Sequence, residues 1–104
     1  MLIDSIRTHL AASKNREYQR RVWLRFEALV EYLDDNGFSK SSLVSKLALD
    51  RETFELSTEQ LTDEGDRWIS QFYDRWLKSL DRAAPKPEKG QYLKSLNRFK
   101  AGNA

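Results

Sequence analysis

The chain has 104 residues, of which 39% are hydrophobic and 12% aromatic, and it contains no cysteine. This length predicts one domain with a single core, and the lack of cysteine excludes disulfides, thiolate zinc sites and cysteine nucleophiles. The formal net charge of +2 hides an uneven distribution, because residues 1–26 and 67–104 carry balances of +4 and +6 whereas residues 27–66 carry −8.

Two helices are predicted in the first third of the chain. A short apolar stripe indicates a helix in residues 2–10, and a longer one indicates a helix at about 16–35. Gly37 stands just after the second helix, where a left-handed residue closes it. The two stripes lie on nearly opposite sides of a helical wheel, so we expect a break at 13–15, where Ser13 or Asn15 caps the second helix. The stripes consist of Leu2, Ile3, Ile6 and Leu10, and of Tyr18, Val22, Trp23, Phe26, Leu29, Val30 and Leu33.

The middle of the chain predicts a short helix followed by an extended segment. Ser39 is the expected N-cap of the helix, which contains Leu43 and Leu47. Near residues 53–57 the apolar side chains alternate with polar ones, which is typical of a strand, and Ser57 with Gln60 forms a capping-box pattern. No second strand is predicted, so we expect one short extended segment that leads into a capped helix.

The strongest helix is predicted at about residues 62–82. Thr62 is the expected N-cap, and acidic residues in the first turn complement the helix dipole. Its apolar side chains cover about half of the helical wheel, so we expect this helix and the one at 16–35 to bury their stripes against each other. The apolar set is Trp68, Ile69, Phe72, Tyr73, Trp76, Leu77 and Leu80.

Two prolines and a glycine between residues 84 and 91 predict a linker, at 85–90, between a helical domain at 1–84 and a last helix at 91–101. This helix is short, basic and amphipathic, and we expect it to dock on the domain because its apolar groups are costly to leave in water. The same groups are candidate contacts with a partner, namely Tyr92, Leu93, Leu96 and Phe99. The fold class is therefore all-α, a bundle of four or five helices with two long ones.

No catalytic or ligand-binding signature is present. His9 is the only histidine, which excludes a multi-histidine metal site within this chain, and we expect it to be an ordinary, partly exposed side chain. The four glycines stand far apart, so no phosphate-binding glycine loop exists. We expect no enzymatic activity, no metal, no cofactor and no small-molecule substrate.

Basic residues form two rows that are candidates for binding an anionic partner. The rows are Lys14, Arg21 and Arg25 on the first long helix, and Arg67, Arg75, Lys78 and Arg82 on the second. Such rows are typical of helices that track phosphates, but they also fit an ordinary solvated face with pairs such as Asp63 with Arg67 and Asp74 with Lys78. The aromatic residues share the apolar faces and do not interleave with the arginines, so they do not support nucleic-acid binding.

The segment "FELSTEQLTDEG", residues 54–65, resembles the part of winged-helix proteins in which a wing strand ends in L-T-x-E-G and a last helix begins. The resemblance implies DNA binding, with a second wing strand beside the first and the short helix in "SKSSLVSKL", residues 39–47, as recognition element. The similarity covers about a dozen residues, and the sequence supplies at most one wing strand.

Two functions fit these observations. The first is a non-enzymatic interaction module in which charge steers the binding of another protein or self-association, for example as a homodimer. The alternative is a nucleic-acid-binding domain that uses the basic helix faces, whether winged-helix-like or simply helical. The longest apolar runs are three residues, far short of the ~20 that span a bilayer, so we expect a cytoplasmic protein without membrane contact.

Overall fold

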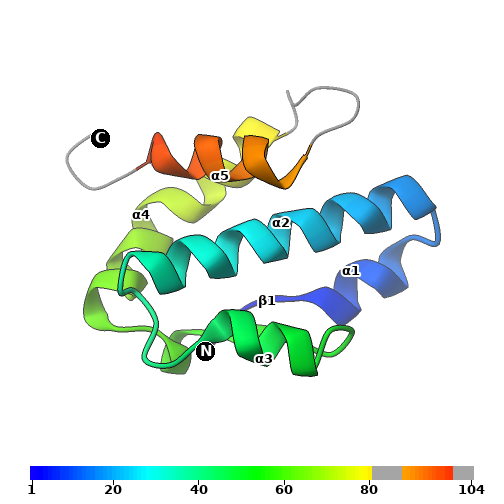
Figure 1. Cartoon of the computed structure of the whole chain (residues 1–104). Helices are drawn as coiled ribbons and strands as arrows, with labels where there is room; N and C mark the ends of the chain where they lie inside the picture. The colour runs from blue at the N-terminus through cyan, green and yellow to red at the C-terminus, as the bar shows by residue number, and fades with distance from the viewer. Residues whose placement is uncertain (81–87, 100–104) are drawn as a thin grey trace.

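The computed structural model describes residues 1–80 and 88–99, and these residues form a mainly helical fold with a small antiparallel sheet. The predicted all-α class with a short extended segment is confirmed. The elements are β1 (Leu2–Ser5), α1 (Ile6–Ala12), α2 (Arg16–Asp35), α3 (Leu43–Leu49), β2 (Glu55–Ser57), the 3-10 turn η1 (Thr58–Gln60), α4 (Asp63–Leu80) and α5 (Lys89–Asn97). Figure 1 shows α2 in the centre, with α5 on one side and α1 and α3 on the other.

Helix α2 begins and ends where the local chemistry favours it. The side chain of Asn15 accepts a hydrogen bond from the backbone N–H of Tyr18 at 2.9 Å, which caps the first turn. At the other end Gly37 adopts a left-handed conformation (φ 70°), and the N–H of Phe38 donates to the carbonyl of Leu33 at 2.9 Å. The predicted break at 13–15 and the predicted stop at Gly37 are both confirmed.

The prediction of a helix from residue 2 is wrong for residues 2–5, because they form the strand β1. Leu2 pairs with Ser57, and Asp4 pairs with Leu56, in an antiparallel register. The N–H of Ile6 then donates to the carbonyl of Phe54 at 3.1 Å, and α1 starts at Ile6. The extended segment β2 needs a hydrogen-bonding partner, and the N-terminal residues supply it from far away in the sequence.

The N-cap of α3 is Ser42 and not Ser39. The backbone of Ser39 pairs with that of Leu61 in an isolated antiparallel bridge, so Ser39 does not start the helix. The carboxylate of Asp34, at the end of α2, accepts hydrogen bonds from the N–H groups of Leu43 and Val44, both at 3.0 Å. Asp34 therefore joins the C-terminal end of α2 to the N-terminal end of α3, where the helix dipole favours a negative charge.

Gly65 allows α4 to pack closely against the turn after α2. A Cβ atom at Gly65 would overlap the carbonyl oxygen of Phe38, which is held in place by the N–H of Thr62 at 2.9 Å. The glycine of "LTDEG" is thus required for helix packing. In the described residues β2 pairs only with β1, so the second wing strand implied by the winged-helix resemblance is not found there.

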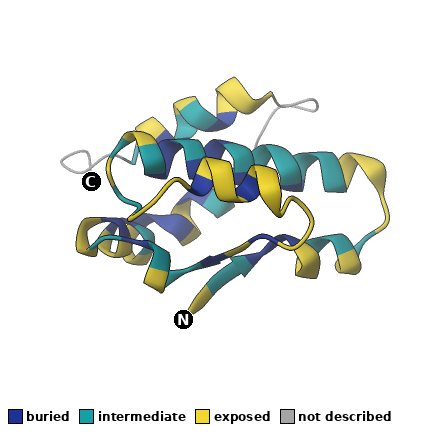
Figure 2. Cartoon of the chain, turned by 60° about the horizontal axis from the view of Figure 1, so that its bottom comes forward, coloured by how far each residue is buried: buried dark blue, intermediate teal, exposed yellow. Residues whose placement is uncertain are grey.

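The core surrounds the buried side of α2, receives side chains from α1, α3, β2, α4 and α5, and is rich in aromatic rings. Trp76 and Leu96 are fully buried, and the rings of Tyr32 and Trp68 lie 5.1 Å apart between α2 and α4. In Figure 2 the helices carry buried residues on the faces turned toward one another and exposed residues on the outer faces. The long helices meet through such rings, but α5 and not α4 makes the most extensive backbone contact with α2.

Two tryptophans of α4 form hydrogen bonds with α5 and the residues that follow it. The indole N–H of Trp76 donates to the hydroxyl of Ser95 at 2.8 Å, and that of Trp68 donates to the carbonyl of Phe99 at 2.9 Å. An ion pair between Lys89 and Glu31 at 3.0 Å joins the start of α5 to α2. The helix runs from residue 89 to 97, against the predicted 91–101. Of the predicted linker at 85–90, residues 85–87 lie outside the described residues, whereas Glu88 is the N-cap of α5 and residues 89 and 90 form its first turn, so the linker prediction is wrong there.

Candidate functional site

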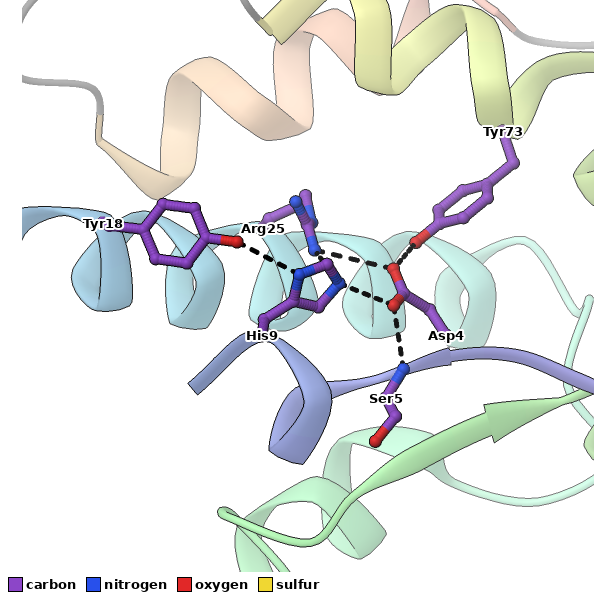
Figure 3. Close-up of polar contacts among 6 residues, drawn as sticks. All are labelled: Asp4, Ser5, His9, Tyr18, Arg25 and Tyr73. Carbon is purple, nitrogen blue, oxygen red and sulfur yellow. Dashed lines mark hydrogen bonds and ion pairs between the residues drawn. The ribbon is translucent and has the colours of Figure 1, made fainter. Parts of the chain in front are cut away.

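A cluster of polar side chains lies where β1, α1, α2 and α4 meet (Figure 3). We call it the Asp4 cluster, and its members are Asp4, His9, Tyr18, Arg25 and Tyr73. The side chains of Asp4 and Arg25 are 14% and 17% exposed, and that of His9 is 25% exposed. These three side chains are therefore largely removed from water, and their charges have to be satisfied within the protein, whereas Tyr18 lies at the exposed rim of the cluster.

The carboxylate of Asp4 is the centre of the cluster. One oxygen, Oδ1, accepts hydrogen bonds from His9 Nε2 at 2.7 Å and from the backbone N–H of Ser5 at 2.8 Å. The other oxygen, Oδ2, accepts from the Tyr73 hydroxyl at 2.6 Å and lies 3.5 Å from Nη2 of Arg25. Each oxygen thus has two partners, so the carboxylate has little capacity left for a further ligand.

The contacts of His9 assign the positions of its protons. Nε2 must carry a hydrogen, because it lies 2.7 Å from a carboxylate oxygen that can only accept. In the neutral ring Nδ1 is then an acceptor, and it receives the Tyr18 hydroxyl at 3.2 Å. Arg25 Nη2 lies 3.0 Å from His9 Nε2. Both nitrogens are donors, so this is a close contact between two groups that share Asp4 as their acceptor and not a hydrogen bond.

The Asp4 cluster has the histidine and carboxylate of a catalytic relay, but its contacts favour a structural role. A relay needs a nucleophile or a water position beside the free nitrogen of the histidine, and here Tyr18 occupies that position. Asp4 holds side chains from α1, α2 and α4 onto β1. Next to the cluster, Tyr18 and Arg25 line a pocket of about 250 Å³ together with Arg21, Val22, Leu77, Leu80 and Tyr92.

Sequence reasoning did not identify the Asp4 cluster. Tyr73 was assigned to the apolar face of α4, and it is indeed buried, but its hydroxyl reaches Asp4 from 69 residues away. Asp4 interrupts the apolar segment formed by Leu2, Ile3 and Ile6. The signal that was available is this acid within an apolar stripe, since a carboxylate there requires buried donors.

Burial raises the pKa of the hydroxyls of Tyr32, Tyr73 and Tyr92, and for Tyr73 the negative charge of Asp4 adds to the effect. A tyrosine in an unfolded chain ionises near pH ~10, so above that pH the unfolded chain releases protons that the folded chain retains. The stability that depends on these neutral hydroxyls is complete below pH ~10 and is lost as the pH rises further.

We therefore expect the free energy of unfolding, measured by urea titration and circular dichroism, to fall steeply above about pH 10. Tyr73→Phe removes one of the titrating hydroxyls. The free energy of unfolding of this variant should be lower than that of the wild type at neutral pH, but it should fall less steeply above pH ~10. The two proteins have the same titratable groups except for this hydroxyl, which makes the difference in slope specific to Tyr73. Equal slopes in the two proteins would contradict this expectation.

The predicted basic row on α2 is brought together only in part, because Arg21 and Arg25 line one pocket and Lys14 does not. Lys14 is exposed, whereas Arg21 is half-buried and lies 3.2 Å from Glu17. Arg25 points into the Asp4 cluster, where its charge faces Asp4. The structure therefore leaves Lys14 apart on the surface and brings Arg21 and Arg25 to one pocket, where each is close to a carboxylate.

The predicted basic row on α4 is exposed. Arg67, Arg75 and Lys78 lie on the outer face of the helix, and none of them forms an ion pair within residues 1–80 and 88–99. The pairs Asp63 with Arg67 and Asp74 with Lys78, which would have neutralised the row, do not form. Arg82 lies outside the described residues.

The predicted partner contacts of the last helix are used within the chain. Tyr92 and Leu96 are buried in the core, and Leu93 and Phe99 pack against it. The ring of Phe99 lies 6.0 Å from that of Phe72 on α4. In this arrangement the outer surface of α5 is left with its polar and charged side chains.

Within the described part of the chain, no group of three or more histidine, aspartate or glutamate side chains is placed to hold a metal ion. In the same residues no helix has the length and apolar character needed to cross a membrane. Comparison with protein families, with curated proteins and with solved structures gave no match to this chain.

Proposed function

We propose that this chain is a non-enzymatic cytoplasmic interaction module in which charge steers the binding of another protein or of a second copy of the chain. The observation that carries the proposal is the outer face of α4. Its charged side chains are all exposed, and none of them forms an ion pair within residues 1–80 and 88–99. They are Asp63, Glu64, Asp66, Arg67, Asp74, Arg75 and Lys78.

The mixture of signs on α4 favours a protein partner over a nucleic acid at this face. A phosphate backbone is negative throughout, so Asp66 and Asp74 would repel it beside the cations that attract it. A protein surface presents both signs and can satisfy acids and bases at once, which fixes the register of the complex and increases the association rate.

Reversal of the α4 cations tests this proposal. In one variant Arg67, Arg75 and Lys78 are replaced by glutamate, and in a matched control Lys40, Lys46 and Lys94, which are also exposed, are replaced by glutamate. Both variants have the same net charge, so they separate the α4 face from general electrostatic attraction. Self-association is measured by light scattering over a range of concentrations, and other partners by cross-linking in cells followed by mass spectrometry.

We expect the wild type and the control to form the same salt-sensitive complex and the α4 variant to lose it. Circular dichroism should show that all three proteins are folded, because the replaced side chains are exposed. The α4 face would be excluded as the binding surface by two results together: the wild type is a monomer at all concentrations, and the wild type and the α4 variant are cross-linked to the same proteins.

A further inference from the structure

A second surface, on the opposite flank of α2 from the Asp4 cluster residues Tyr18 and Arg25, combines arginines with an aromatic ring. It is a shallow groove of about 330 Å³ between the first half of α2 and the turn that precedes β2. We call it the Trp23 groove. Its lining residues are Arg16, Gln19, Arg20, Trp23, Leu24, Glu27 and Arg51.

Trp23 lies at the edge of the apolar stripe of α2. It packs against the core, as the stripe predicts, but it is only half-buried and also lines the groove, whereas Trp68 and Trp76 are buried. The aromatic ring is therefore interleaved with arginines at this surface. This removes, for the Trp23 groove, the objection that the aromatic residues and the arginines occupy separate faces.

Arg51 is held over the indole ring of Trp23. Its guanidinium carbon lies 4.4 Å from the ring centroid, and Nη2 forms an ion pair with Glu27 at 3.1 Å. The side chain of Arg51 is nevertheless 55% exposed. The two contacts fix a planar cation at the surface and leave part of it accessible, so little conformational entropy is lost when a ligand stacks on it.

The groove carries more positive than negative charge. Three arginines line it against the single carboxylate of Glu27, which is already paired with Arg51. Arg16 is exposed and forms no ion pair in the described part of the chain, and Lys14 adds a further exposed cation just before it. Arg20 is engaged with Glu17 at 3.6 Å. The groove is thus complementary to an anion that also has a flat, stackable group.

We propose that the Trp23 groove binds single-stranded nucleic acid, with a base stacked on the Arg51 guanidinium above Trp23 and the neighbouring phosphates held by Arg16 and Arg20. Bases stack on aromatic rings and on guanidinium planes, and arginines next to them neutralise the backbone. A duplex keeps its bases stacked inside and offers no free base face, so the groove selects single strands. An acidic peptide has carboxylates but lacks the repeated flat groups that would use Arg51 and Trp23.

The test is a titration of the full chain with fluorescein-labelled oligothymidylate and oligouridylate, followed by anisotropy over a series of salt concentrations. We expect binding at low salt that weakens linearly in a plot of log affinity against log salt. Arg16→Ala should lower the steepness of that plot by about 0.7, the value for one phosphate contact with a single strand. Arg51→Ala should weaken binding about tenfold, because it removes the stacking surface.

Two controls make the result specific to the groove. Arg51→Lys keeps the charge but loses the plane, so it should weaken binding nearly as much as Arg51→Ala if stacking matters. The double variant Arg67→Ala and Arg75→Ala on α4 should bind like the wild type. Both sets of residues are exposed, and thermal unfolding should confirm that each variant is folded.

Three results would overturn the proposal. The first is the absence of binding at low salt. The second is an equal loss of affinity in the groove variants and the α4 variant, which would indicate general charge attraction. The third is competition by an acidic peptide, or by a duplex of the same length, as effective as that by the unlabelled single strand. Because the groove and α4 variants differ, failure here does not affect the test of the α4 face.

Discussion

Asp4→Ala is expected to lower the free energy of unfolding by about 3–5 kcal/mol, which is the effect of leaving one member of a buried ion pair without its partner. The substitution removes the acceptor for His9, Tyr73 and Arg25 together. Arg25 is affected most, since its Nε atom is buried and already has no hydrogen-bond partner. The measurement is equilibrium unfolding in urea followed by circular dichroism.

The matched variant Arg25→Met separates the charge from the packing. In the double variant Asp4→Ala with Arg25→Met no buried charge is left unpaired, so the loss should be smaller than the sum of the two single losses by at least about 1 kcal/mol. Additive losses would show that the two groups do not interact energetically, and the Asp4 cluster would then not act as one unit.

Trp76→Ala is expected to cost about 3–5 kcal/mol, because it removes the largest fully buried side chain and leaves a cavity between α4 and α5. It also removes the indole N–H that binds Ser95. We expect hydrogen exchange to increase first in α5, since that helix loses both the packing and the hydrogen bond. The free energy is measured by urea unfolding with circular dichroism, which does not depend on the lost tryptophan.

Two further variants define the contribution of the hydrogen bond and of a surface residue. Ser95→Ala leaves the Trp76 N–H buried without an acceptor and should cost about 1–3 kcal/mol. Leu49→Ala, at a side chain that is 85% exposed, should change stability by less than about 0.5 kcal/mol. A loss at Trp76 as small as that at Leu49 would contradict the assignment of Trp76 to the core.

The two long helices could be predicted closely because local chemistry determines them. The stripe at 16–35 has a capping residue before it and Gly37 after it, and the observed α2 has these bounds. Helix α4 starts one residue later than expected, after Thr62, whose hydroxyl accepts the N–H of Gly65 at 3.2 Å. Periodicity and caps act within a few residues, so a sequence pattern contains them in full.

Strand β1 and the Asp4 cluster could not be predicted because their partners are distant in the sequence. Residues 2–5 fit a short helical stripe equally well, and only the pairing with Glu55–Ser57 makes them a strand. Trp23 and Arg25 lie on the same helix, yet one faces the surface groove and the other faces Asp4. Which neighbours cover each face is a tertiary property that helical periodicity leaves open.

The pairing of β1 with β2 also has a consequence for the order in which the chain assembles during synthesis. Helix α2, its turn and α3 contain their own contacts, including Asp34 with the start of α3, so they can form as soon as they emerge. The N-terminal strand must wait for residues 55–57, and Asp4 waits for Tyr73. A nascent chain that stops before β2 therefore exposes an unpaired strand edge, and one that stops before Tyr73 has an incomplete charge cluster. Both are features that favour aggregation and recognition by chaperones.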